Sequence, residues 1–182
     1  MRSTRFALFA AIATLAIAPL ADAKLSRTSD AAKAHFHSVT NVSMAIDGDT
    51  PEVAVAEEGA NIKVTVTLTN LTTGITLRDK HAREFLEVGK FPTTTLTVPR
   101  ALLKFPADGA KSEGDVAGSM NLHGQDKPVT FHYAASRRGA AISVTGNVAL
   151  DITNFGMSEP SHLGIKVKKD VTVEVAFVAQ DI

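Results

Sequence analysis

The chain has 182 residues, of which 45% are hydrophobic and 21% are charged, and its 19 basic and 19 acidic residues balance. This length fits one globular domain, and the ordinary apolar fraction excludes a disordered chain. The balanced charge gives no support to nucleic-acid binding through a basic surface. Because the chain has no cysteine, disulfides, thiolate metal ligands, thiol nucleophiles and lipidated cysteine anchors are excluded as well.

The start of the chain has the pattern of a cleaved signal peptide. Two arginines precede an apolar run over residues 6–20, and Ala21 and Ala23 supply the small residues of a cleavage site. The run is shorter than the roughly 20 residues that cross a bilayer, which argues against a membrane anchor. We therefore expect residues 1–23 to be removed, and residues 24–182 to form one soluble domain in the periplasm without stable membrane insertion.

Most of the remaining chain has apolar residues at every second position, which is the period of a half-buried β-strand. Threonine and valine, which favour strands, are abundant in these stretches. The clearest strands are predicted over residues 62–69, 116–122, 129–135, 142–150 and 171–179. Shorter strands are predicted over residues 34–39, 42–46, 53–56, 94–98 and 102–105. The connections between them are short, which predicts antiparallel pairing.

One segment, residues 76–88, contains good helix formers and predicts a short α-helix. Thr76 and Asp79 have the spacing of a capping pair at the start of such a helix. Leu77, Phe85 and Leu86 are expected to face the core. Seven to nine antiparallel strands and one helix leave a closed barrel or a sandwich as the architecture. An outer-membrane barrel is disfavoured, because the chain has one tyrosine and no tryptophan for aromatic girdles.

The histidines do not form a recognisable metal or catalytic motif in the sequence. His35 and His37 share one face of a predicted strand, but no third metal ligand is evident nearby, so we interpret them as surface residues. His123 begins a turn, residues 123–128, and Pro128 is expected to open the strand that follows. The chain also lacks a nucleophile elbow, a zinc-protease motif and a phosphate-binding loop. We therefore expect a protein that is not an enzyme and uses no metal or cofactor.

Three blocks of sequence resemble the YceI-like family. They are LRDKH, EFLEV and FP at residues 77–81, 84–88 and 91–92; GSMNLHG and KPVT at residues 118–124 and 127–130; and NFGM at residues 154–157. The resemblance implies an all-β, antiparallel, lipocalin-like β-barrel of about eight strands with one short α-helix. It also implies non-catalytic binding of a polyisoprenoid, an isoprenoid quinone or another long-chain lipid inside the barrel, and it leaves a homodimer open.

The chain departs from the family pattern at two places. The opening stretch over residues 34–38 matches poorly, and the family's basic and acidic residues near the third block fall on Ile152 and Asn154. If those two positions contact a ligand head group, this chain has lost the contact and its ligand differs from that of its relatives.

The candidate ligand-binding residues are those expected to face the lumen or to lie at the helix entrance. Gly118 and Gly146 are in phase with the apolar residues and would leave space for a ligand. Arg78, Asp79 and His81 are candidates for contact with a polar head group. The remaining candidates are Val64, Val66, Leu77, Phe85, Leu96, Met120, Phe131, Ile142, Val144, Phe155, Met157 and Val175. The alternative is a β-sandwich stress-response or interaction module whose core is filled, since close packing is the norm.

Overall fold

The computed structural model describes residues 25–27, 32–162 and 164–181. The predicted signal peptide, residues 1–23, lies outside the described residues. Within the described part, no helix combines the length and the apolar character that crossing a bilayer requires.

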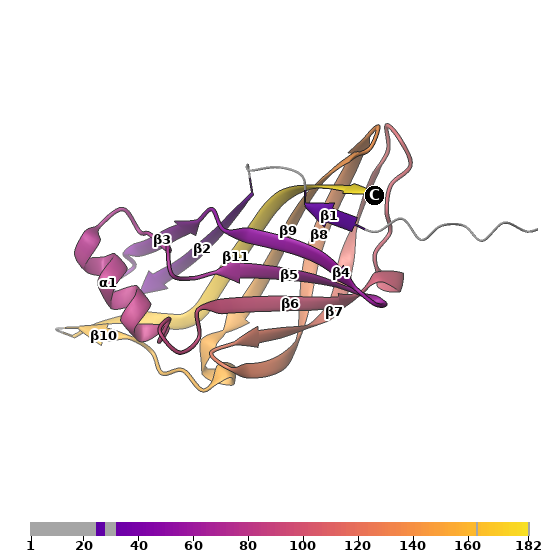
Figure 1. Ribbon diagram of the computed structural model, residues 1–182. Helices are drawn as coiled ribbons and strands as arrows, with labels where there is room; N and C mark the ends of the chain where they lie inside the picture. The colour runs from indigo at the N-terminus through magenta and orange to yellow at the C-terminus, as the bar shows by residue number, and fades with distance from the viewer. Residues whose placement is uncertain (1–24, 28–31, 163, 182) are drawn as a thin grey trace, which may run out of the picture.

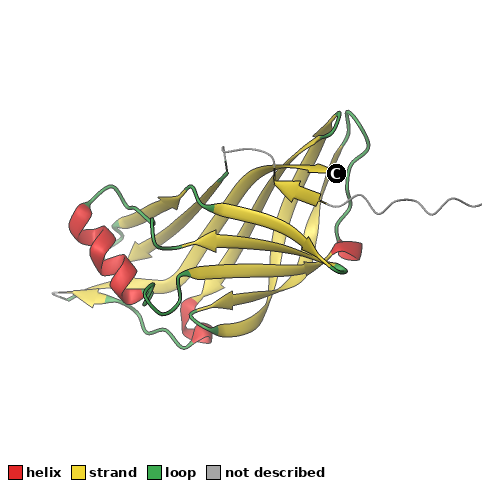
Figure 2. Cartoon of the chain, in the orientation of Figure 1, coloured by secondary structure: helices red, strands yellow, loops and turns green. Residues whose placement is uncertain are grey.

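The described chain consists of strands, one α-helix and two short 3₁₀ helices (Figure 2). The strands are β1 (Leu25–Arg27), β2 (Lys33–Thr40), β3 (Ala45–Thr50), β4 (Val53–Glu58), β5 (Asn61–Thr67), β6 (Thr93–Pro99), β7 (Lys111–Leu122), β8 (Gln125–Arg138), β9 (Ala141–Asp151), β10 (Ser161–His162) and β11 (Ile165–Asp181). The helices are α1 (Thr76–Phe85), η1 (Arg100–Leu102) and η2 (Ile152–Phe155).

The strands form one antiparallel sheet that curls into a barrel (Figure 1). From β4 to β9 the neighbours follow chain order, and β9 pairs with the long strand β11. The short strand β1 pairs with both β11 and β4, so β1, β4, β5, β6, β7, β8, β9 and β11 form a closed circuit of pairings. The hairpin of β2 and β3 continues the sheet from the side of β11. The predicted all-β, lipocalin-like barrel is confirmed, and one continuous sheet excludes the two packed sheets of a sandwich.

The core lies inside the barrel because the strands alternate in the way the sequence predicts. In β9, Ile142, Val148 and Leu150 are buried, while their neighbours Ser143 and Ala149 are exposed. The same alternation runs through the other long strands. Each strand therefore gives one apolar face to the interior, and the burial of those faces drives the sheet to curl.

The helix α1 lies across one end of the barrel (Figure 1). Its start differs from the prediction, because the N-cap position is Ile75 and makes no side-chain cap bond. The carboxylate of Asp79 instead accepts hydrogen bonds from the backbone N–H and the hydroxyl of Thr73, at 2.6 and 2.5 Å. The predicted capping pair of Thr76 and Asp79 is therefore wrong, since Asp79 reaches back to the turn before the helix.

The helix presents only part of its predicted core face to the barrel. Phe85 and Leu86 pack against the core, as predicted. Leu77 is 64% exposed, and its prediction as a core residue is wrong. Leu77 belongs to the first turn of α1, and the residues that pack against the core, Ala82, Phe85 and Leu86, come later in the segment.

Two strand predictions are also wrong, one in its existence and one in its bounds. Residues 102–105 do not form a strand, because η1 begins at Arg100 and the backbone N–H of Lys104 donates to the Tyr133 hydroxyl at 2.8 Å. The strand predicted over residues 42–46 instead runs from Ala45 to Thr50. The turn at Ser43, whose φ is 63°, precedes it.

The connection between β7 and β8 is a tight two-residue turn. His123 and Gly124 both have positive φ, at 52° and 72°, which is the backbone of a type I′ hairpin. The role of His123 as a turn residue is confirmed. Pro128 does not open β8 as predicted, since it pairs with Ser119 inside the β7–β8 ladder. It lies before His132, where pairing with β9 begins, so among the described residues β8 has no strand partner on the β9 side at that point.

Candidate functional site

The barrel encloses a cavity of about 350 Å³ whose wall is mostly apolar. Strands β2, β3, β5, β6, β7, β8, β9 and β11 contribute to the wall, and α1 contributes at one end. Ligand pockets in proteins span roughly 300–1,000 Å³, so the volume suits a slim ligand. The lumen is therefore not filled by the protein's own side chains, contrary to the filled-core alternative.

Most of the candidate residues predicted from the sequence lie on the wall of this cavity. They are Val64, Val66, Arg78, His81, Phe85, Leu96, Met120, Phe131, Val144, Gly146, Met157 and Val175. They come from β5, β6, β7, β8, β9, β11, α1 and the segment after η2. Alternation within strands places the apolar members here, and the position of α1 places the polar ones.

Five predicted candidates lie off the cavity wall. Leu77 is exposed to solvent, and Asp79 accepts hydrogen bonds from the turn before α1. Ile142 and Phe155 are almost completely buried among other core residues, at 0% and 2% exposure. Ile142 and Phe155 therefore support the fold rather than the surface of the cavity.

The fifth of these residues, Gly118, is covered by the neighbouring strand. A Cβ atom at Gly118 would lie 3.0 Å from the backbone oxygen of Thr97 and 3.2 Å from Cδ1 of Leu96. Gly146 differs, because the closest atom to a Cβ there is the backbone oxygen of His132 at 3.9 Å. Of the two glycines predicted to leave space, only Gly146 has open space at its Cβ position.

Several wall residues were not predicted as ligand-binding. Tyr133 and Phe177 are in phase with predicted residues of β8 and β11, so the alternation alone was a sufficient signal. Others lie in connections without periodicity, such as Leu71, Leu103 and Pro160. Their place on the wall depends on how the connections fold over the barrel ends, for which a single sequence carries no signal.

Polar groups gather where the wall meets α1. Arg78 donates from Nη2 to the backbone oxygen of Thr73 at 2.7 Å, which fixes the guanidinium beside the cavity. The Nε–H of Arg78 is buried and has no hydrogen-bond partner among the described residues. Hydrogen bonding from the Thr73 hydroxyl lowers the pKa of Asp79, which keeps the carboxylate in that turn ionised. A buried donor without an acceptor is costly, so Arg78 is prepared to receive an oxygen atom.

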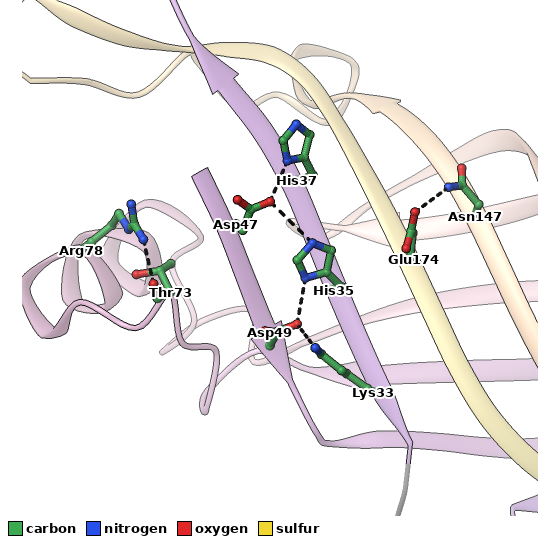
Figure 3. A network of polar contacts seen from close by, with 9 residues as sticks. All are labelled: Lys33, His35, His37, Asp47, Asp49, Thr73, Arg78, Asn147 and Glu174. Atoms are coloured by element: carbon green, nitrogen blue, oxygen red, sulfur yellow. Dashed lines mark hydrogen bonds and ion pairs between the residues drawn. The ribbon is translucent and has the colours of Figure 1, made fainter. Parts of the chain in front are cut away.

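The pair His35 and His37 belongs to a polar ladder between β2 and β3 (Figure 3). His35 Nδ1 lies 2.8 Å from an Asp49 oxygen, and His37 Nδ1 lies 2.6 Å from an Asp47 oxygen. Hydrogen bonding to His37 lowers the pKa of Asp47. In the described part of the chain, no three His, Cys, Asp or Glu side chains are arranged to hold a metal ion. The ladder is a set of cross-strand pairs, which stabilise a hairpin.

The two positions at which the chain departs from the family pattern lie in different environments. Ile152 is buried and lies on the cavity wall, whereas Asn154 is exposed. The wall therefore carries an apolar side chain where the family pattern has a basic one.

Comparison with known proteins agrees with the fold. The profile described as YceI-like domain matches residues 22–179. A "UPF0312 protein" of Pseudomonas syringae pv. tomato is 28% identical over 140 residues, which cover 70% of this chain and 68% of that protein.

Solved structures show the same architecture. A polyisoprenoid binding domain from Saccharophagus degradans, implicated in plant cell wall breakdown, superposes with a TM-score of 0.73 at 17% identity, covering 88% of this chain and 99% of that one. BcnA of Burkholderia cenocepacia superposes with a TM-score of 0.62 at 14% identity, covering 81% of this chain and 95% of that one. The profile match, which spans nearly the whole barrel, shows that the chain belongs to the YceI-like family.

Proposed function

We propose that the protein binds a polyisoprenoid or a similar long-chain lipid, with the apolar tail in the cavity and the polar head beside Arg78. The observation that carries the proposal is the unfilled apolar cavity inside the barrel. The name of the Saccharophagus degradans domain, whose fold is similar, supports the same ligand class. In this proposal the protein acts in the periplasm and sequesters or carries the lipid.

Burial of the tail supplies the free energy of binding. Each buried methylene contributes about 0.8 kcal/mol, so a tail of about twenty carbons contributes on the order of 15 kcal/mol before losses. Lost translational and chain entropy offsets a large part of this gain. Because burial is not directional, the wall distinguishes poorly among tails of similar width. Discrimination between ligands therefore falls to the polar groups at the α1 end.

The head group is expected to carry an oxygen acceptor. The buried Nε–H of Arg78 lacks a partner among the described residues, and Thr73 and His81 lie on the same part of the wall. A hydroxyl, carbonyl or phosphate oxygen at this place would satisfy the arginine. A hydrogen bond to a charged group contributes about 1.5–3 kcal/mol, which is enough to orient a ligand in an otherwise uniform cavity.

The hydroxyl groups of Ser38 and Tyr133 on the wall contact backbone atoms rather than a general base. The Ser38 hydroxyl donates to the backbone oxygen of Asp170 at 3.1 Å, and the Tyr133 hydroxyl accepts from the backbone N–H of Lys104. These contacts hold both hydroxyls to the backbone. A nucleophile for hydrolysis would instead be hydrogen-bonded to a general base.

The proposal is tested by mass spectrometry under native conditions. The purified protein is incubated with geranylgeraniol, farnesol or hexadecanoic acid in detergent, and bound molecules are read as added mass. Lipid extracted from protein purified from its own host identifies the natural ligand. We expect one retained lipid per barrel and tighter binding of the longer isoprenoid. A protein that gains no mass with any of the three, and from which no lipid is extracted, would contradict the proposal.

A further inference from the structure

Exposed apolar side chains concentrate at the α1 end of the barrel. Among the described residues, the large exposed hydrophobic side chains are Val42, Met44, Ile75, Leu77, Leu102 and Ile165, with exposures from 39% to 64%. Only Leu102, in η1, belongs to the segment that connects β6 to β7. The others lie on the β2–β3 turn, on the β10–β11 hairpin and at the start of α1. The labels of α1, β3 and β10 show that these elements share one end of the molecule (Figure 1).

The two hairpin tips are held against each other. The backbone N–H of Asn41 donates to the Lys166 oxygen at 2.8 Å, and the Lys166 N–H donates to Oδ1 of Asn41 at 3.0 Å. Val42 and Met44 on one tip and Ile165 on the other therefore lie on adjoining segments. We call these three residues the tip patch. Exposed apolar residues gathered in this way mark a site of interaction with a protein or a membrane.

The tip patch adjoins residues that line the cavity. Ile46, two residues after Met44, and Val167, two residues after Ile165, both line the cavity wall. The polar group proposed for the ligand head, Arg78, lies on the wall at the same end. An exposed apolar surface that leads into an apolar cavity suits the transfer of a lipid between the two.

The charge around the tip patch favours an anionic surface as the partner. Residues 40–46 and 161–169 contain three lysines and no aspartate or glutamate, and the flanking carboxylates are Asp47, which His37 contacts, Glu159 and Asp170. Lys169 pairs with Asp151 at 2.6 Å, and the exposed Lys166 and Lys168 carry positive charge beside Ile165. Lysines that flank apolar side chains are attracted to anionic lipid head groups while the apolar side chains enter the interface.

We infer that the tip patch docks on the surface of an anionic phospholipid bilayer, and that the lipid ligand passes between bilayer and cavity at this end. The inference rests on the proposed function for the role of the cavity. Docking itself depends only on the tip patch and its lysines. The bilayer is favoured over a protein partner because the same end holds both the cavity wall and the basic charge.

The test uses flotation of the chain from residue 24 onward, which contains every described residue, with lipid vesicles. One set of vesicles contains phosphatidylethanolamine with phosphatidylglycerol, and a second contains phosphatidylcholine alone. We expect the protein to float with the anionic vesicles and to bind them less as salt is raised. The triple variant Val42→Ser, Met44→Ser, Ile165→Ser is expected to lower the partition coefficient by about tenfold or more.

Matched variants distinguish a specific role of the tip patch from a general effect of removing exposed side chains. Leu102→Ser removes an exposed apolar side chain from a segment outside the α1 end and is expected to leave flotation unchanged. Lys166→Gln with Lys168→Gln is expected to reduce binding to anionic vesicles and its salt dependence. Circular dichroism and Tm verify that each variant is folded. Equal loss from Leu102→Ser and the triple variant would overturn the inference.

Uptake of geranylgeraniol from detergent distinguishes docking from lipid binding. A triple variant that takes up geranylgeraniol normally but no longer floats supports docking. A wild-type protein that takes up geranylgeraniol but never floats overturns docking and leaves the proposed function in place. A wild-type protein that floats but takes up no geranylgeraniol supports docking and contradicts the proposed function. Dimers that depend on the tip patch, without flotation, would overturn docking in favour of a second copy of the chain.

Discussion

Gly146 lies directly opposite Val175 in the β9–β11 ladder, and both residues line the cavity. On its other side Gly146 pairs with Tyr133, so a residue without a side chain separates two larger ones. The nearest atom to a Cβ at this position is 3.9 Å away. Part of the space in the cavity is therefore due to the missing side chain of Gly146.

Replacing this glycine should fill the cavity without breaking the fold. In Gly146→Leu the added side chain has room, so we expect loss of geranylgeraniol uptake in native mass spectrometry and a Tm close to that of the wild type. The control is Gly118→Leu, whose side chain would meet Thr97 and Leu96. We expect that control to destabilise the protein by about 1–3 kcal/mol through overpacking. Normal uptake by a folded Gly146→Leu variant would contradict this account of the cavity.

Arg78 should contribute to affinity only for lipids with an oxygen in the head group. Arg78→Met keeps an unbranched apolar stem but removes the buried Nε–H. We expect it to weaken geranylgeraniol binding by about tenfold or more, because a hydrogen bond from a charged donor is lost. Binding of phytane, a hydrocarbon of the same length, should not change. Lys80→Met, which removes an exposed cation from the same helix, is the control. Equal weakening for both ligands would show that Arg78 supports the fold instead.

The ion pair between Asp151 and Lys169 should make the stability of the folded protein depend on pH. Hydrogen bonding from Lys169, at 2.6 Å, and then from Thr153 lowers the pKa of Asp151 to about 2. Because this folded pKa is below the usual value, the stabilisation is complete above about pH 4 and is lost as the pH falls toward 2. Asp151→Asn should therefore lower Tm at pH 7 and have a much smaller effect near pH 2.

Thermal unfolding followed by circular dichroism between pH 7 and pH 2 measures this difference. Glu113→Gln, at an exposed position of β7, controls for the loss of one surface carboxylate. A Tm difference between wild type and Asp151→Asn that stays constant over the whole range would refute the linkage.

Replacing Gly124 with alanine should destabilise the fold more than replacing the other hairpin-turn glycine, Gly139. Its φ is +72°, and a Cβ would lie 2.5 Å from Cε1 of Phe91, whereas at Gly139 the φ is +60° and a Cβ would have no atom within 4 Å. Both alanine variants incur about 1–2 kcal/mol for a left-handed residue, and only Gly124→Ala incurs overpacking of about 1–3 kcal/mol more. Urea denaturation of both variants checks the order, and equal values would refute the role of Phe91.

The alternating strands were predictable because their signal is local. In β9 the period of two places Val144 and Gly146 inward from sequence alone, and the structure agrees. The error at Gly118 has a tertiary cause, since β6 covers a position whose own strand pattern points inward. Leu77 shows the same limit, because its exposure depends on where the helix crosses the barrel end. Family resemblance, rather than periodicity, was needed to choose a barrel over a sandwich.

The strand β11 pairs with β1 and β2 at the opposite end of the chain, through contacts such as that between Ser38 and Lys168, 130 residues apart. These ladders cannot form until the ribosome has released almost the whole polypeptide. The β2–β3 and β4–β5 hairpins can pair locally, but the edges of β1 and β2 that pair with β11 stay open until then. Premature termination anywhere before β11 should therefore leave an aggregation-prone, unclosed sheet.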